Sequence, residues 1–305
     1  MSERDDIRFD TEFDPCWGEP VEVRAGVARL TARNAGPMTF KGTNTYLLGE
    51  TRLVVIDPGP ADDGHFEALQ RAIGARPVEA ILLTHRHRDH TGLVDRLRRS
   101  TRAPVLAAPP RAVAPTDRSG ATDDSPDDEL LVDRYLADAE TLATPAGTLE
   151  VVATPGHTAD HLAFALAGPG ILFSGDHVMA WSTTVVAPPE GSMAAFMASI
   201  ERLLARETDR IYLPGHGGPV TRPQPFLRAL RTHRRMREAG ILERVRAGDG
   251  SVAEIVAALY RSLDPQLRGA AALSVLAHLE ALCQAGLVRT DSEGAPRVDG
   301  LFWPA

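Results

Sequence analysis

The stretch Ile81–His90 (ILLTHRHRDH) constrains the fold of this chain more than any other, because an apolar run ends abruptly in three histidines and an aspartate. The continuous apolar run predicts a buried strand, and loops that follow such strands present functional groups in α/β folds. His85 and His87 are two residues apart and can point the same way, while Asp89 and His90 can turn toward an adjacent point. The spacing therefore predicts two ligands for each of two neighbouring metal ions. The alternative is a polar loop with incidental histidines.

Three further motifs weaken that alternative. His157 follows a predicted strand in TPGHT, Asp176 follows another in FSGDH, and His216 follows a third in PGHGG. Glycines beside these side chains let the backbone approach a crowded centre closely. Four strand ends thus supply five histidines and two aspartates, which chance explains poorly. Imidazoles and carboxylates are zinc ligands, and a set without thiolate also suits iron or manganese.

The order of the predicted elements indicates the fold class. Residues 20–56 contain short apolar bursts separated by Gly and Pro, which predicts strands joined by tight turns. Predicted strands then alternate with helices up to about residue 216, which favours an α/β (α+β) fold whose sheets are covered by helices on their outer faces. Beyond that point three helices and a hairpin near Ser292–Gly294 are typical of a winged-helix-like module. We therefore expect a catalytic domain over residues 1–221 and a small winged-helix-like domain over residues 222–305.

Charge and composition narrow the partners. The net charge is −8 and the pI is near 5.7, whereas proteins that bind polyanions usually carry a basic excess. The predicted last helix, residues 265–285, has one arginine and no lysine, so we do not expect it to bind duplex DNA. We expect it to pack either against the main domain or against a second subunit, and only the second arrangement would make the protein a homo-oligomer.

The expected cellular compartment is inferred from sequence features that are not found. The N-terminal residues do not resemble a secretory signal, and no apolar run is long enough to cross a bilayer. The only cysteines, Cys16 and Cys283, exclude a disulfide framework and a cysteine-ligated metal site. A cytoplasmic protein without a membrane partner is expected. The acidic, Pro-rich segment 109–128 is expected to be a surface excursion, either a lid or an idle insertion.

The series THRHRDH, TPGHT, SGD and PGHG resembles the motifs of the metallo-β-lactamase superfamily, whose fold is a four-layered αββα sandwich. The likeness extends to the β-lactamase-like protein 2 group over nearly the whole chain, including the C-terminal module. The segments that carry it are GTNTYLL (42–48), IDPGP (56–60), ATPGHTADHLAF (153–164), LFSGDHVMAWSTTVV (172–186) and THRRMRE (232–238).

The resemblance implies a ligand set and a mechanism. It assigns two Zn²⁺ ions per chain, with Fe or Mn as alternatives. Two such cations can share a water and lower its pKa toward neutrality, so that a metal-bridging hydroxide becomes the nucleophile of a hydrolase. Asp89 is then the expected catalytic residue that orients the hydroxide and accepts its proton. By the resemblance, one metal is held by His85, His87 and His157, the other by Asp89, His90 and His216, and both are bridged by Asp176.

Other residues are expected around this centre. Asp57 resembles the superfamily aspartate that accepts an N–H from a metal-bound histidine, and a turn-forming role beside Pro58 is the alternative. His161 is expected to be a hydrogen-bonded partner of the site together with Asp160. Arg86 places a cation near the pocket mouth, which favours an anionic substrate, unless it is a solvated loop residue. The remaining candidates for the substrate cleft are His177, Trp181, Ser182, Thr183 and Thr184.

Three functions remain open. The first is hydrolysis of a carbonyl ester, thioester or lactone in a small-molecule substrate, which the net acidity favours. The second is cleavage of single-stranded RNA, for which a row of helix arginines would track the phosphate backbone. The third is a metal-binding scaffold without turnover. A secreted β-lactamase is not expected, because no signal is found. The helix arginines are Arg228, Arg231, Arg234, Arg235 and Arg237.

Overall fold

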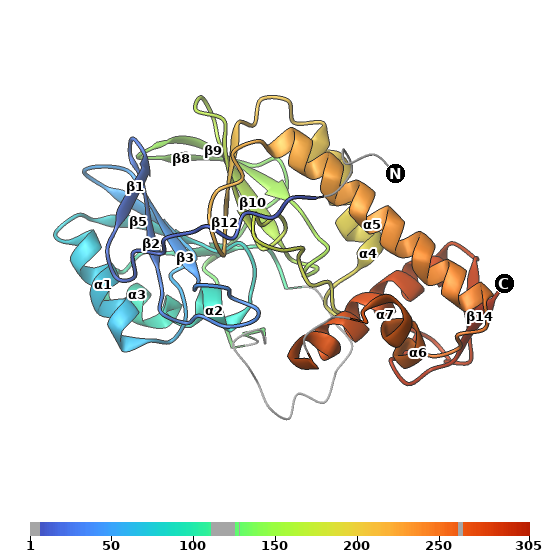
Figure 1. Ribbon diagram of the computed structural model, residues 1–305. Coiled ribbons are helices and arrows are strands. Elements are labelled where there is room, and N and C mark those ends of the chain that lie inside the picture. The colour runs from blue at the N-terminus through green and yellow to red at the C-terminus, as the bar shows by residue number, and fades with distance from the viewer. Residues whose placement is uncertain (1–6, 111–125, 128, 262–264) are drawn as a thin grey trace.

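The computed structural model describes residues 7–110, 126–127, 129–261 and 265–305, and its first sheet has seven strands in chain order (Figure 1). The first four strands pair antiparallel, and the last four pair parallel, so β4 belongs to both sets. The strands are β1 (Val21–Arg24), β2 (Val27–Thr31), β3 (Asn44–Leu48), β4 (Leu53–Ile56), β5 (Val78–Leu82), β6 (Val105–Ala107) and β7 (Arg134–Tyr135).

The second sheet has five strands in the order β12-β11-β10-β9-β8. β11 and β12 pair parallel, and the other neighbours pair antiparallel. The strands are β8 (Thr141–Thr144), β9 (Gly147–Ala153), β10 (Leu162–Leu166), β11 (Ile171–Gly175) and β12 (Ile211–Pro214).

Three apolar clusters define four layers. One cluster, which includes Leu82 and Phe164, fills the space between the two sheets. A second lies under α1 (Asp63–Ile73) and α3 (Val94–Thr101) on the outer face of the first sheet. The third lies between the second sheet and the helices α4 (Met193–Leu204) and α5 (Pro223–Arg246). The expected αββα sandwich is confirmed.

Sequence signals also set the helix ends. Asp62 caps α1 by accepting the backbone N–H of His65, and Gly74 ends this helix with φ +60°. Ser192 caps α4 in the same way by accepting the N–H of Ala195. In the described part of the chain, no helix is both long enough and apolar enough to span a membrane.

The C-terminal module has a core of its own. It consists of α6 (Val252–Leu259), α7 (Arg268–Gln284) and a hairpin of β13 (Val288–Thr290) and β14 (Phe302–Pro304). The first half of α5 packs on the second sheet, and its second half packs on this module. α7 also contacts α4, as expected for packing against the main domain. The domain boundary predicted at 221/222 thus falls just before a helix that is shared by both cores.

The strands β7 and β8 were not predicted. β7 has two residues, both exposed, and β8 lies at a sheet edge with one buried side chain, so neither produces an apolar alternation in the sequence. Most of the predicted excursion 109–128 lies outside the described residues.

Candidate metal centre

The predicted ligands lie at one end of the two sheets, because each follows a strand or a turn between strands. Asp57 follows β4, and His85 and His87 follow β5. α2 (Arg88–Thr91) is a single turn that begins after His87 and carries Asp89 and His90. From the second sheet, His157 lies in the turn between β9 and β10, Asp176 follows β11, and His216 follows β12.

Three histidines form one pole of the centre. Ligand atoms of His85, His87 and His157 all lie within 4.8 Å of one another. Nδ1 of His87 faces Nε2 of His157 at 3.2 Å. Two imidazole nitrogens held this close can bind a shared cation. This is the set that the resemblance implied for the first metal.

An aspartate and two histidines form the other pole. Oδ2 of Asp89 lies 3.3 Å from Nε2 of His90 and 3.2 Å from Nε2 of His216. Asp176 stands between the poles, because its Oδ2 is 3.1 Å from Nε2 of His216 and 3.9 Å from Nε2 of His157. The structure therefore brings all seven predicted ligands together, in the arrangement expected of two triads with one shared carboxylate.

Buried polar atoms test whether a metal fits. Nε2 of His85 is buried and has no hydrogen-bond partner among the described residues, and Nε2 of His90 and Oδ1 of Asp176, which lie 3.5 Å apart as an ion pair, make no hydrogen bond there either. Buried polar atoms rarely lack partners in native proteins, and all three atoms face the centre. His85, His90 and Asp176 also form a third group with ligand geometry. The donor set of nitrogens and carboxylate oxygens suits zinc, iron or manganese.

Further groups orient the ligand rings. Asp57 is buried, and its Oδ2 lies 2.9 Å from Nδ1 of His90 while also accepting the hydroxyl of Thr84 at 2.7 Å. Nδ1 of His157 donates to the carbonyl of Val185 at 2.8 Å, which leaves Nε2 for a metal. Such outer hydrogen bonds fix the tautomer of a metal ligand.

His161 acts through the backbone and not as a ligand. Its Nε2 accepts the N–H of Asp176 at 3.1 Å, and its Nδ1 lies 2.8 Å from the hydroxyl of Thr154. Both ring nitrogens are therefore engaged, and burial lowers the pKa of His161 well below its usual range. A neutral His161 holds the start of the Asp176 loop.

The electrostatics differ between the two poles. Burial lowers the pKa of His85 and lowers that of His157 to about 4, so both are neutral, as metal ligands must be. At the other pole burial acts in the same direction, but the carboxylates of Asp89 and Asp176 outweigh it. They raise the pKa of His90, and they raise that of His216 to about 10. In the metal-free chain these two imidazolium groups neutralise the carboxylates.

Of four residues expected in the substrate cleft, one is ion-paired, two are buried and one is partly exposed. Arg86 is not a free cation, because its Nε lies 3.4 Å from Oδ2 of Asp160 and both side chains are largely buried. His177 is fully buried against Phe196, with ring centroids 4.4 Å apart, so it is part of the core. Thr184 is buried as well, and Thr183 is partly exposed.

Several contributors to the site were not predicted. The hydroxyl of Thr43 donates to Oδ2 of Asp89 at 3.2 Å. The side-chain amide of Asn44 donates to the carbonyls of Pro214 and Gly217, which ties the first sheet to the His216 loop. Oε2 of Glu190 lies 3.5 Å from Nε2 of His87. The GTNTYLL segment was a sequence signal for the first two, whereas no local pattern indicates Glu190.

Comparison with known proteins agrees with this geometry. Residues 38–216 match the model of the metallo-beta-lactamase superfamily, and residues 251–295 match the beta-lactamase associated winged helix domain. The chain is 33% identical to the beta-lactamase-like protein 2 homolog of Drosophila melanogaster, covering 88% of this chain and 91% of that protein. It is 28% identical to the atrochrysone carboxyl ACP thioesterase AgnL7 of Paecilomyces divaricatus, over 81% of this chain and 76% of that protein. A beta-lactamase domain protein from Burkholderia ambifaria has the same fold, with a TM-score of 0.80, 24% identity and 96% coverage of both chains.

Proposed function

Because the chain belongs to the metallo-beta-lactamase superfamily, we propose that it is a hydrolase that uses two Zn²⁺ ions to cleave a carbonyl ester, thioester or lactone. The observation that carries the proposal is the convergence of two ligand triads on Asp176. The complete ligand set, with a buried Nε2 of His85 that makes no hydrogen bond among the described residues, supports metal binding at this centre.

The protein groups have separate tasks in this reaction. Two cations held by these ligands would supply polarisation of the scissile carbonyl and a lower pKa for the attacking water. Asp89 orients that water and accepts its proton, and Thr43 fixes the orientation of the Asp89 carboxylate by donating to Oδ2. Asp57 and Val185 hold the imidazoles of His90 and His157 in the tautomers that leave Nε2 free for a metal.

The surroundings of the helix arginines support a small carbonyl substrate over RNA. Arg231 and Arg235 both pair with Glu201 at 2.9 Å. Arg234 is buried, and the guanidinium of Arg237 lies 4.3 Å from the ring centroid of Tyr260. Four of the five arginines that might have tracked a phosphate backbone are therefore already engaged.

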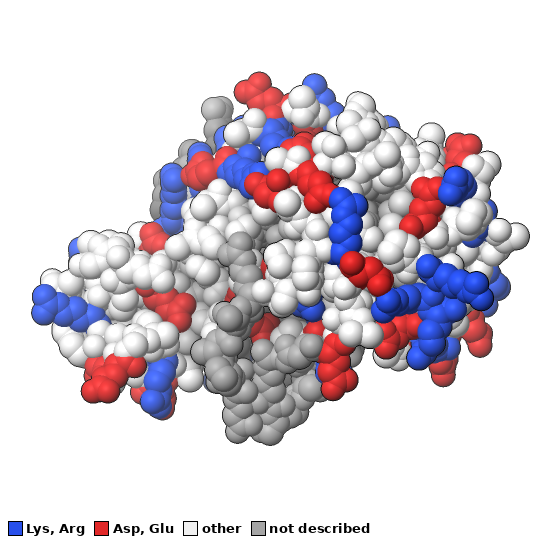
Figure 2. Space-filling view, turned by 180° about the vertical axis from the view of Figure 1, so that it is seen from behind, with Lys and Arg blue, Asp and Glu red and all other residues white. Residues whose placement is uncertain are grey.

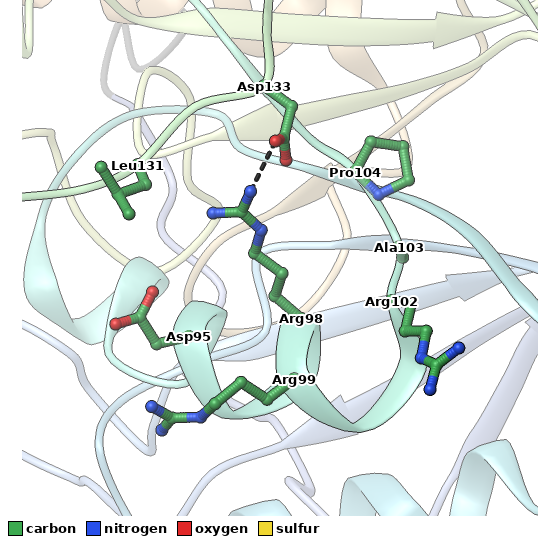
Figure 3. A pocket seen from close by; sticks show the side chains of 8 residues that line it. All are labelled: Asp95, Arg98, Arg99, Arg102, Ala103, Pro104, Leu131 and Asp133. Atoms are coloured by element: carbon green, nitrogen blue, oxygen red, sulfur yellow. Dashed lines mark hydrogen bonds and ion pairs between the residues drawn. The ribbon is translucent and has the colours of Figure 1, made fainter.

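A basic patch on one face of the molecule lies away from the predicted metal ligands, which does not favour RNA cleavage. On the face in Figure 2, basic side chains gather on the side of the molecule that holds α1 and α3. A pocket of about 600 Å³ there is lined by Arg98, Arg99 and Arg102, and Arg98 is paired with Asp133 (Figure 3). This pocket opens where β6 and β7 begin, whereas the predicted ligands of the first sheet follow the end of β5, at the opposite end of these parallel strands.

A substrate panel tests the proposal. Zinc-loaded protein is assayed on an acyl thioester, a lactone and a labelled single-stranded RNA oligonucleotide, each with and without EDTA. The Asp89→Asn variant is run in parallel as a control for contaminating hydrolases. EDTA-sensitive cleavage of the thioester or lactone is expected. Cleavage of the oligonucleotide alone, weakened by salt, would establish the nuclease alternative, and inactivity on every substrate would favour the scaffold.

A further inference from the structure

Arg234 is a cation in the interior of the protein. Only 4% of this residue is exposed, although it lies on α5 between surface arginines that pair with Glu201. Burial lowers the pKa of Arg234 to about 10, so the guanidinium is still charged at neutral pH. No ion pair between Arg234 and a carboxylate occurs in the part of the chain that the structure describes. A buried charge without a counter-ion costs free energy, so its other contacts explain its position.

Those contacts lead toward the metal centre. The guanidinium donates through an Nη atom to the backbone carbonyl of Thr184, and its Cζ lies 5.0 Å from the ring centroid of Phe196. Phe196 in turn packs against His177, the residue that follows Asp176. The arginine therefore fixes one backbone carbonyl in the segment that follows the Asp176 loop.

The segment Thr184–Val185 contacts the shared ligand Asp176 and one ligand of the first pole, His157. The hydroxyl of Thr184 donates to the backbone carbonyl of Asp176 at 2.6 Å and to that of His177 at 3.1 Å. The carbonyl of Val185, one residue on, accepts Nδ1 of His157 at 2.8 Å. A displacement of this segment would therefore change the orientation of the shared carboxylate and of one imidazole together.

We propose that Arg234 is a positioning residue for the metal centre: it holds Thr184–Val185 where Asp176 and His157 can bind the same ion. The inference rests on the proposed metal centre but not on the identity of the substrate. It also makes metal binding depend on α5, the helix that connects the catalytic core with the C-terminal module. A purely structural Arg234 would stabilise the fold without affecting metal affinity.

Metal binding by the full-length chain separates the two roles. Metal-free Arg234→Met and Thr184→Val proteins are titrated with Co²⁺, and the absorption spectrum and affinity are recorded together with the melting temperature of the metal-free state. We expect both variants to bind at least one ion about 10- to 100-fold more weakly than the wild type, as when groups that orient metal ligands are removed, and to show an altered spectrum. Arg234→Lys retains the charge but not the guanidinium geometry, so partial rescue is expected.

Arg231→Met is the matched control, because it removes a surface arginine one turn away on α5. It should bind Co²⁺ as the wild type does. A folded Arg234→Met protein with wild-type affinity and spectrum and a lower melting temperature would overturn the inference. If that variant does not fold, Thr184→Val decides, and unchanged affinity there overturns it. A wild-type protein that binds two ions but hydrolyses nothing would contradict the proposed function and leave the positioning role intact.

Discussion

At the scale of single residues, Gly215 shows how tightly the centre is packed. A Cβ atom at this position would lie 2.2 Å from Oδ1 of Asp176 and 2.7 Å from Cε1 of His90. Gly215→Ala is therefore expected to displace the shared carboxylate and to weaken metal binding about tenfold or more. Gly218→Ala is the control, because its Cβ would lie 3.5 Å from Phe13, an ordinary contact. Metal content after dialysis measures the effect, and equal retention by both variants would contradict the argument.

Asp89 carries the second prediction at this scale. Its carboxylate is buried, lies 3.2 Å from Nε2 of His216 and accepts the hydroxyl of Thr43. Asp89→Asn removes the group that orients the water and accepts its proton, so turnover should fall by at least about 100-fold. Steady-state kinetics with metal analysis of the same preparation tests this. Near-normal turnover with both metals retained would exclude Asp89 from the mechanism.

At the scale of elements, the segment from β11 to α4 supports both poles. It contains Asp176, the Thr184–Val185 pair and Glu190, whose Oε2 lies 3.5 Å from Nε2 of His87. We predict that Glu190→Gln lowers the metal affinity of the first pole about tenfold, because the ring of His87 loses a carboxylate partner. Glu207→Gln, at an exposed position after α4, is the control. Competition with a chromophoric chelator measures the affinity, and identical affinities for both variants would leave Glu190 without a role at the metal.

At the scale of the whole molecule, metal ions and protons compete for the same buried histidine and aspartate side chains. In the metal-free chain the pKa of His216 is raised to about 10, so its contribution to stability is full below its ordinary value near 6.5 and is lost as the pH rises through about 10. The carboxylates of Asp89 and Asp176 have lowered pKa values, so their contribution is full above about pH 4 and is lost in acid. The stabilising contributions of His216, Asp89 and Asp176 to the metal-free protein should all be full between about pH 4 and 6.5.

The stabilisation of the protein by metal binding should therefore depend on pH. His90 and His216 must lose their protons to bind a cation. We therefore predict that Zn²⁺ raises the melting temperature more at pH 8 than at pH 6, and that loading in weak buffer releases protons. Differential scanning calorimetry of zinc-loaded and EDTA-treated protein across this range provides the measurement. The same zinc-dependent increase at both pH values would mean that these imidazoles are already neutral without metal.

The sequence by itself identified the candidate metal ligands and most of the helices and strands. Apolar runs that end in histidine or aspartate predicted the ligands, and short apolar bursts separated by Gly and Pro predicted the strands of residues 20–56. These signals are local, because a strand end or a turn is encoded within a few neighbouring residues. The edge strands β7 and β8 were missed, since pairing at an edge requires little burial and leaves little periodicity.

Only the tertiary structure decided which groups support the ligands and which charges are available. The partners of Arg86, Arg234 and Glu190 come from segments distant in the sequence, and no spacing rule identifies them. Two packed sheets and the helix α5 bring these segments together, and burial then determines whether a cation faces solvent or holds a backbone carbonyl. Ligand identity follows from residue type, but ligand orientation depends on contacts that exist only after the chain has folded.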